Sequence, residues 1–234
     1  GVTDSPPQAY RQHRFRPPSG AADLIIVRHG ESAPQTYEDP HPLVDGRSDP
    51  PLDPRGHEEA RLVAQRLAKE DVAAIYVTSL RRTVETAAPL AAALGLEPRV
   101  EADLAEVYLG EWEGAAFRHK TRAGDPLAVE MYVQGRWDVI PGAEPTDAFH
   151  QRIRAAIGRI AAAHADERVV IVTHGGVIGT LLSLATGAHP FAFVGASNAS
   201  INHLVVAGDR WIVRRYNDTG HLGTDLDRPA EPLT

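Results

Sequence analysis

The chain has 234 residues, of which 43% are hydrophobic and 24% charged, and its formal charge is −7. This is the composition of a globular protein with enough material for a sizeable core. Cysteine is absent, which excludes a disulfide framework, a thiolate nucleophile and cysteine-ligated metal sites. The net acidity argues against non-specific nucleic-acid binding, and no apolar run is long enough to span a bilayer or to act as a secretory signal. We therefore expect a soluble cytoplasmic protein without a nucleic-acid or membrane partner.

Apolar runs that are typical of buried strands occur three times along the chain. Residues 24–27, 74–77 and 169–172 are short and wholly apolar, as expected of strands covered on both faces. Two later runs, 201–206 and 211–216, flank a Gly-Asp pair and indicate a hairpin.

Helices are predicted between these strands. Asp53 and Pro54 suit the N-cap and the first position of a helix, and Gly95 suits the end of an alanine-rich helix over 82–94. Apolar residues at helical spacing predict a long helix over 146–164, and another helix is expected over 177–186. Strands that alternate with helices imply an α/β fold, a three-layer α/β/α sandwich around a mostly parallel sheet.

The expected domain organisation follows from the segments that break this alternation. Residues 1–20 are rich in proline and arginine and predict an extended amino-terminal arm, while 223–234 read as a carboxyl-terminal tail. The domain then occupies 21–222. We expect a small cap built from insertions near 33–54 and 110–141, where periodicity is weak.

Residues that suit phosphate chemistry follow each of the apolar runs. Arg28 and His29 follow the first run, Arg82 lies shortly after the second, and His174 and Gly175 follow the third. Because ligands bind beyond the carboxyl ends of the strands in open α/β sheets, these side chains are expected to meet at one rim. Arginine matches phosphate oxygens in pairs, and a neutral imidazole can attack phosphorus. A carboxylic acid nearby would protonate the leaving alcohol.

Four stretches in this order resemble the histidine phosphatase superfamily, which includes the cofactor-dependent phosphoglycerate mutases. They are LIIVRHGES at 24–32, TSLRRTVETA at 78–87, LAEVYLGEWEG at 104–114 and VTHGGVI at 172–178, and the resemblance extends over residues 23–222.

The resemblance implies a role for individual residues. His29 would be the phosphorylated nucleophile and Glu106 the proton donor. The phosphate pocket would consist of Arg28, Arg82, His174 and the Gly175 amide. Ser32, Gln35 and Arg47 are candidate substrate contacts. No metal and no cofactor are implied.

Two departures from the family pattern bear on the reaction. Gln35 stands where family members usually carry asparagine. The segment after Glu106 offers Arg118, His119, Lys120 and Arg122 but no adjacent arginine pair of the kind with which the mutases grip a carboxylate. This basic segment would either attract an acidic substrate or form a solvated face.

These departures favour a phosphatase over a mutase. We therefore expect a metal-independent phosphate monoester hydrolase that acts on a small phosphorylated substrate through a phosphohistidine. A phosphoglycerate mutase-type phosphoryl transfer and an inactive phosphate-binding module remain as alternatives. The identity of the substrate and the oligomeric state stay open.

Overall fold

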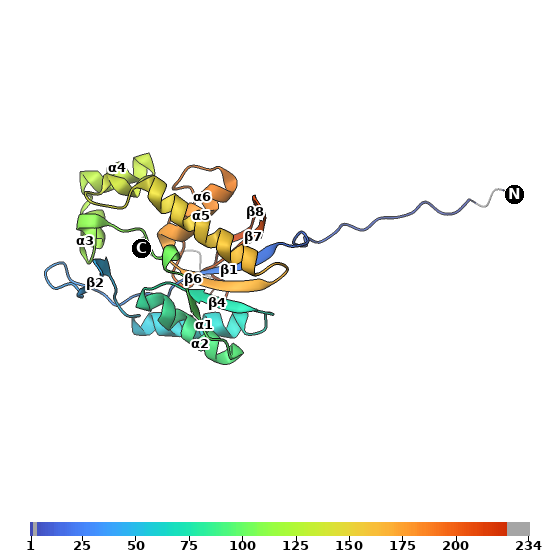
Figure 1. Cartoon of the computed structure of the whole chain (residues 1–234), viewed down its shortest axis with the longest axis horizontal. Helices are drawn as coiled ribbons and strands as arrows, with labels where there is room; N and C mark the ends of the chain where they lie inside the picture. The colour runs from blue at the N-terminus through green and yellow to red at the C-terminus, as the bar shows by residue number, and fades with distance from the viewer. Residues whose placement is uncertain (2–3, 224–234) are drawn as a thin grey trace.

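The computed structural model describes residue 1 and residues 4–223, and its centre is a mixed sheet of six strands in the order β5-β4-β6-β1-β7-β8 (Figure 1). Strands β5, β4, β6 and β1 are parallel, and β7 is antiparallel to both of its neighbours. The strands are β1 (Ala22–Arg28), β4 (Ala74–Val77), β5 (Arg99–Val100), β6 (Arg168–Thr173), β7 (Ile201–Ala207) and β8 (Arg210–Asp218). The predicted α/β sandwich with a mostly parallel sheet is confirmed.

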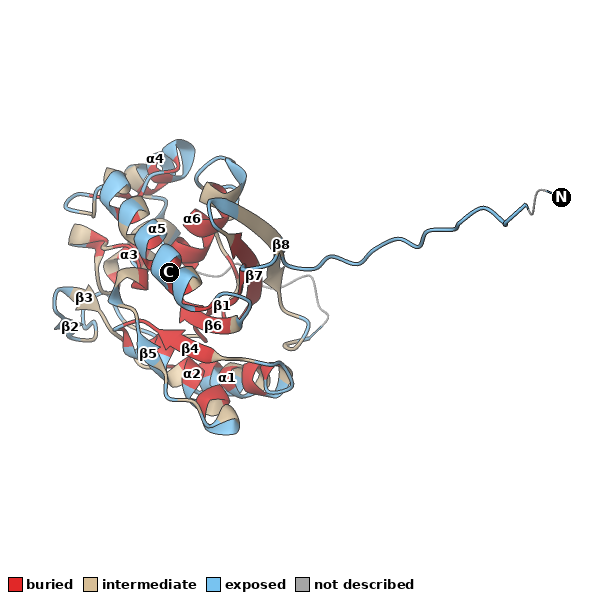
Figure 2. Cartoon of the chain, turned by 45° about the vertical axis from the view of Figure 1, so that its right-hand side comes forward, coloured by how far each residue is buried: buried red, intermediate tan, exposed pale blue. Residues whose placement is uncertain are grey.

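The central strand β1 is buried along its whole length because both faces of the sheet are covered (Figure 2). Successive side chains of a strand point to opposite faces. Leu24 and Ile26 accordingly belong to one core, and Ile25 and Val27 to the other. The wholly apolar runs are thus explained by two separate cores rather than one.

Four helices supply the covering layers (Figure 1). Helices α1 (Pro54–Leu67) and α2 (Arg81–Leu94) contribute to the core beneath one face, while α5 (Thr146–Ala163) and α6 (Gly175–Thr186) contribute to the other. The side chain of Asp53 caps α1 by accepting from the amide of Arg55, as the sequence predicts. Gly95 ends α2 with a positive φ of 65°, a conformation that glycine adopts without strain.

Helix α6 begins at Gly175, two residues earlier than the pattern predicts. The apolar stripe that marks the helix starts only at Val177, and glycine carries no signal for a helix start. His174 occupies the N-cap position with an extended backbone, so the amides of Gly175 and Gly176 form the first turn of the helix. This start brings the amino end of α6 directly beside His174.

The two segments expected to form a cap carry short elements of their own. The first contains the hairpin β2 (Leu43–Val44) and β3 (Arg47–Ser48). The second segment is helical. Its periodicity is weak because its helices are short and each ends at or near a glycine. It contains the helices α3 (Ala116–Ala123) and α4 (Pro126–Gln134), which are preceded by the 3-10 helix η2 (Gly110–Trp112) and followed by the 3-10 helix η3 (Trp137–Val139). A further 3-10 helix, η1 (Ala102–Leu104), precedes this segment. Both tryptophans are buried and pack near the ring of Phe117.

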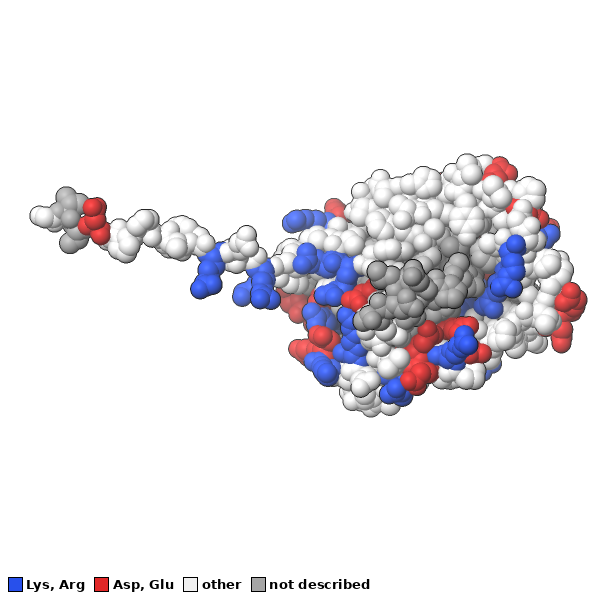
Figure 3. Space-filling view, turned by 180° about the vertical axis from the view of Figure 1, so that it is seen from behind, with Lys and Arg blue, Asp and Glu red and all other residues white. Residues whose placement is uncertain are grey.

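The amino-terminal arm leaves the domain as an extended segment (Figure 1). Phe15 in this arm contacts the sheet: the centroid of its ring lies 3.8 Å from the guanidinium carbon of Arg214 on β8. Basic side chains lie along the arm and on the adjoining face, where acidic ones are mixed with them (Figure 3). The predicted tail lies outside the described residues apart from Gly223. Within the described part of the chain, no helix is long and apolar enough to cross a membrane.

Candidate active site

Two histidines meet at the carboxyl edge of the sheet. His29 follows β1 and His174 follows β6, and these strands are adjacent and parallel. The two rings are buried, with their centroids 5.3 Å apart and their planes inclined by 61°. The sequence places these residues 145 positions apart, and parallel pairing of their strands brings them together.

The imidazole of His29 is held as a neutral base. Its Nδ1 lies 2.7 Å from the carbonyl oxygen of Gly30, and because a carbonyl only accepts, Nδ1 carries the proton. The lone pair of the ring is therefore on Nε2, which accepts from Nε of Arg82 at 3.2 Å. Burial, followed by the charges of Arg82 and Arg28, lowers the pKa of His29 well below its ordinary value.

Two arginines surround this imidazole. Arg28 is 1% exposed and donates to the carbonyl of Ala196. Arg82 comes from α2 and also donates to the carbonyl of Ser48, at 3.0 Å, in the hairpin segment. Burial lowers the pKa of Arg82 to about 10, a value at which the guanidinium still carries its charge at neutral pH. Arg82 therefore contacts Nε2 of His29 directly, and the charge of Arg28 also acts on this imidazole.

His174 presents one nitrogen to the protein and one to the site. Its Nε2 lies 2.9 Å from the hydroxyl of Thr78, which follows β4. Its Nδ1 is buried and has no hydrogen-bond partner among the described residues. Burial and the charge of Arg82 lower the pKa of His174 well below the ordinary histidine value. A buried nitrogen without a partner marks a place where a ligand would complete the hydrogen bonding.

Glu106 lies at the same site, after η1. One carboxylate oxygen accepts from the amide of Val107 at 2.9 Å, and the other accepts from the amide of Gly176 at 3.0 Å. The side chain is buried, and burial raises its pKa above the usual glutamate value even though these amides and the nearby arginines act in the opposite direction. A carboxyl with a raised pKa keeps its proton to a higher pH than an ordinary glutamate, which is a property of general acids.

A cavity opens beside Glu106 and Arg82. The three candidate substrate contacts of the sequence all line it: Ser32, Gln35 and Arg47. Arg47 donates to the backbone carbonyl of Glu106, and Gln35 donates to the hydroxyl of Ser48 at 3.3 Å. Gly175, the remaining predicted phosphate contact, is buried at the amino end of α6.

Three residues of the site were not assigned a role from the sequence. Arg118 is largely buried, lines the cavity and donates to the hydroxyl of Ser32 at 2.7 Å, and burial lowers its pKa. Glu113 is half-buried in the cavity wall, where its carboxylate accepts from the amides of Ser48 and Leu109. Thr78 orients His174. The spacing from a strand end points to Thr78, whereas no local pattern distinguishes Arg118 from its basic neighbours.

The donor set of the site consists of imidazoles and guanidiniums around one carboxyl. Among the described residues, no three histidine or acidic side chains gather in a way that would hold a metal ion. The fold and the site together are those of an α/β enzyme with two histidines at the centre of its candidate active site.

Comparison with known proteins agrees with this class. The family model of the histidine phosphatase superfamily (branch 1) matches residues 24–219, so the chain belongs to that superfamily. Among its relatives, phosphoglycerate mutase-like protein 4 of Arabidopsis thaliana is 36% identical over 86% of this chain and 87% of its own. The metal-independent phosphoserine phosphatase of the same plant is 30% identical over 88% of this chain and 85% of its own.

Solved structures share the fold. The phosphoglycerate mutase of Bacillus anthracis has a TM-score of 0.72 at 24% identity, over 87% of this chain and 96% of its own. A mycobacterial glucosyl-3-phosphoglycerate phosphatase has a TM-score of 0.71 at 25% identity, over 85% of this chain and all of its own (100%). The relatives and structural neighbours thus include proteins named as mutases and proteins named as phosphatases, and the latter support a phosphatase of the histidine type.

Proposed function

We propose that this protein hydrolyses phosphate monoesters of small metabolites in two steps, with His29 as nucleophile and Glu106 as proton donor. The observation that carries the proposal is the pair of buried neutral imidazoles 5.3 Å apart, one with its lone pair facing Arg82 and the other with an unpartnered nitrogen.

In the first step, the lone pair on Nε2 of His29 attacks phosphorus and the ester P–O bond breaks. The departing alkoxide takes the proton of Glu106. Arg28 and Arg82 neutralise the charge of the phosphoryl oxygens, and His174 donates a hydrogen bond to them from Nδ1 once it is protonated beside the bound dianion. The Gly175 amide at the amino end of α6 adds a donor.

In the second step, water attacks the phosphohistidine. Glu106, now ionised, takes a proton from the water as the P–N bond breaks, and the bond's electron pair returns to Nε2 of His29. Inorganic phosphate leaves, and both residues regain their starting protonation states. This cycle needs no metal ion, because the charge is neutralised by the arginines.

The residues that line the cavity suit a substrate whose leaving group is a small polar alcohol. Arg118 and Ser32 lie on this wall together with Gln35 and Glu113, so that cationic, neutral and anionic groups are all within the same cavity. Such a wall fits a short metabolite that carries its own charged groups. Phosphoserine and phosphorylated glycerate derivatives, which the relatives' names suggest, therefore belong in a substrate panel with sugar phosphates, nucleotides and phosphopeptides.

The experiment that tests the proposal measures phosphate release across this panel. In addition, reactions are quenched with acid or with base, and the phosphoryl group that remains on the enzyme is measured after each. We expect an acid-labile, base-stable phosphoryl group in the native enzyme and none in His29→Ala, which should lose activity by at least about a thousandfold. His57→Ala is the matched control, because its side chain is 58% exposed and lies outside the cavity. Vanadate should inhibit, and chelation of metals should leave the rate unchanged. Inhibition by EDTA that a divalent cation reverses would contradict the mechanism.

A mutase reaction is the second candidate, and the half-buried Arg118 favours it, because a guanidinium beside Ser32 could hold a substrate carboxylate. Both reactions share the phosphohistidine, and they differ in whether water or a second hydroxyl accepts the phosphoryl group. The ratio of phosphate released to phosphoglycerate isomerised separates them. Absence of any phosphorylated enzyme with the whole panel would instead favour a phosphate-binding module without activity.

A further inference from the structure

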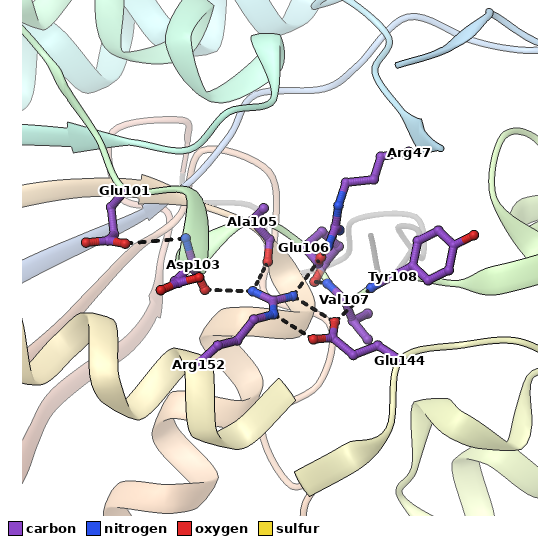
Figure 4. A network of polar contacts seen from close by, with 9 residues as sticks. All are labelled: Arg47, Glu101, Asp103, Ala105, Glu106, Val107, Tyr108, Glu144 and Arg152. Atoms are coloured by element: carbon purple, nitrogen blue, oxygen red, sulfur yellow. Dashed lines mark hydrogen bonds and ion pairs between the residues drawn. The ribbon is translucent and has the colours of Figure 1, made fainter. Parts of the chain in front are cut away.

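Arg152 on α5 lies behind the proton donor and uses its whole guanidinium to hold it (Figure 4). A guanidinium has five N–H donors. Those of Arg152 go to the carbonyls of Asp103, Ala105 and Glu106, at 2.6, 2.7 and 3.0 Å, and to both carboxylate oxygens of Glu144, at 2.7 and 2.9 Å. The side chain is 16% exposed. Each hydrogen bond is charge-assisted and little diluted by solvent.

Glu144 extends this grip to the other side of the proton donor. Its carboxylate also accepts from the amide of Tyr108, at 3.2 Å. The Arg152–Glu144 pair therefore holds the backbone on both sides of Glu106, from Asp103 to Tyr108 (Figure 4). The carbonyl of Glu106 accepts a second hydrogen bond from Arg47, on the cavity side.

The segment needs such support because it has no regular structure of its own. Helix η1 ends at Leu104, and helix η2 starts at Gly110, so that the backbone between them belongs to neither a helix nor a strand. Its carbonyls lack the partners that a helix or a sheet would supply, and buried carbonyls without partners are costly. Arg152 supplies those partners from α5.

We propose that Arg152 is a positioning residue for proton transfer: it acts through the backbone of residues 103–106 to set the carboxyl of Glu106 against the leaving oxygen. This inference rests on the proposed role of Glu106 as proton donor. Arg152 itself does not line the cavity, and its charge is paired with Glu144, so it acts on geometry rather than on substrate binding.

The test compares two substrates in the same enzyme preparation. An alkyl phosphate releases a strongly basic alkoxide that needs the proton of Glu106, whereas p-nitrophenyl phosphate releases a weakly basic phenolate that leaves without it. For Arg152→Lys, we expect kcat/KM for the alkyl phosphate to fall at least about tenfold more than kcat/KM for p-nitrophenyl phosphate, because small misplacement of a catalytic group is costly. The ratio of the two values is independent of the folded fraction.

Arg159→Lys is the matched control. Arg159 lies on the same helix and bonds the side chains of Glu101 and Asp103 in the same loop, but it is 52% exposed and contacts no carbonyl of that loop among its described bonds. Its substrate ratio should stay at the native value. Glu144→Gln, which weakens the grip but keeps Arg152, should give a smaller shift in the same direction as Arg152→Lys.

Glu106→Gln separates the failure of this inference from that of the proposed function. If Glu106→Gln is selective against the alkyl phosphate and Arg152→Lys lowers both substrates equally or neither, Arg152 has no positioning role. If Glu106→Gln is itself unselective, the assignment of the proton donor is wrong. Should Arg152→Lys fail to yield soluble enzyme, the ratio for Glu144→Gln decides, and a native ratio there overturns the inference.

Discussion

His29 and Glu106 need opposite protonation states for the proposed first step, and their surroundings shift each pKa in the required direction. Burial and two arginines lower the pKa of His29, so that it stays neutral to a lower pH than an ordinary histidine. Burial raises the pKa of Glu106, so that it keeps its proton to a higher pH than an ordinary glutamate. The working form of the site, with His29 neutral and Glu106 protonated, therefore exists in the pH range between the two pKa values.

This arrangement predicts the shape of the pH profile. As the pH rises through the raised pKa of Glu106, kcat/KM for an alkyl phosphate should fall, because the carboxyl loses the proton that it must donate. The same limb should be weak with p-nitrophenyl phosphate and absent in Glu106→Gln, whose profile with the alkyl phosphate serves as the control. A basic limb that is identical in the native enzyme and in Glu106→Gln would contradict the prediction.

Gly176 gives a second prediction at an individual position. A Cβ built there would lie 2.4 Å from a carboxylate oxygen of Glu106, and the flexible carboxylate would have to move away. We expect Gly176→Ala to lower kcat/KM for an alkyl phosphate by roughly a hundredfold while the fold is kept, because the carboxyl loses its amide donor and its place.

Gly158→Ala in α5 is the control for this substitution, because nothing lies within 4 Å of a Cβ built there. Alanine favours a helix interior over glycine by about 0.5–1 kcal/mol, so this variant should be at least as stable as the native protein and equally active. Kinetics and thermal unfolding of both variants check the pair. Native activity in Gly176→Ala would show that the contact is not used.

Between elements, the end of β8 is tied to α1 by a charged group. The two terminal guanidinium nitrogens of Arg66, Nη1 and Nη2, donate to the carboxylate of Asp218 at 2.9 and 2.7 Å, and Arg215 adds a third bond at 3.0 Å. The bonds from Arg66, and a smaller contribution from Arg215, hold the pKa of Asp218 well below its usual range. Because the pKa of Asp218 is lower in the folded than in the unfolded state, its carboxylate stabilises the fold fully at pH values above the pKa of the unfolded state. This contribution is lost as the pH falls through the pKa of the folded state.

Asp218→Asn should therefore lower the free energy of unfolding by about 1 kcal/mol at neutral pH, a figure reduced for partial exposure of the pair. The difference from the native protein should shrink below about pH 4, where this carboxylate begins to gain its proton in the unfolded chain while it stays ionised in the folded protein. Denaturant titrations at neutral and acid pH measure both values. Glu58→Gln removes a fully exposed pair with Arg61 and should change nothing measurable. An effect of Asp218→Asn that is equal at both pH values would indicate loss of packing rather than of charge.

For the molecule as a whole, we propose that the amino-terminal arm is separable from the catalytic domain. Its described residues up to Phe15 are exposed, and Phe15 meets Arg214 on the edge strand. Removal of residues 1–14 should leave kcat/KM unchanged and shift the melting temperature by no more than about 1 °C, because exposed termini bury little apolar surface. Thermal unfolding and steady-state kinetics of the shortened chain test this. A loss of stability or activity would assign the arm a structural or catalytic role.

Much of the architecture is legible in the chain itself. The wholly apolar runs predict the buried strands, and Asp53 and Gly95 mark helix ends that the structure has within a residue. The strand-end motifs also identify His29 and His174, since parallel strands deliver their following residues to one edge. These signals are local, because hydrophobic periodicity and helix capping depend on residues only a few positions apart. Such patterns can therefore be recognised in the sequence alone.

Other parts of the site depend on contacts between segments far apart in the chain. Arg118 reaches Ser32 across 86 positions, and Arg152 reaches the carbonyl of Glu106 across 46. Neither arginine differs in its neighbours from arginines that lie in solvent. Packing of α3 and α5 against the core sets which carbonyls or hydroxyls a guanidinium can reach, and burial lowers the pKa of Arg118. A short sequence window contains neither quantity, because both are properties of distances between segments and of the solvent that those segments exclude.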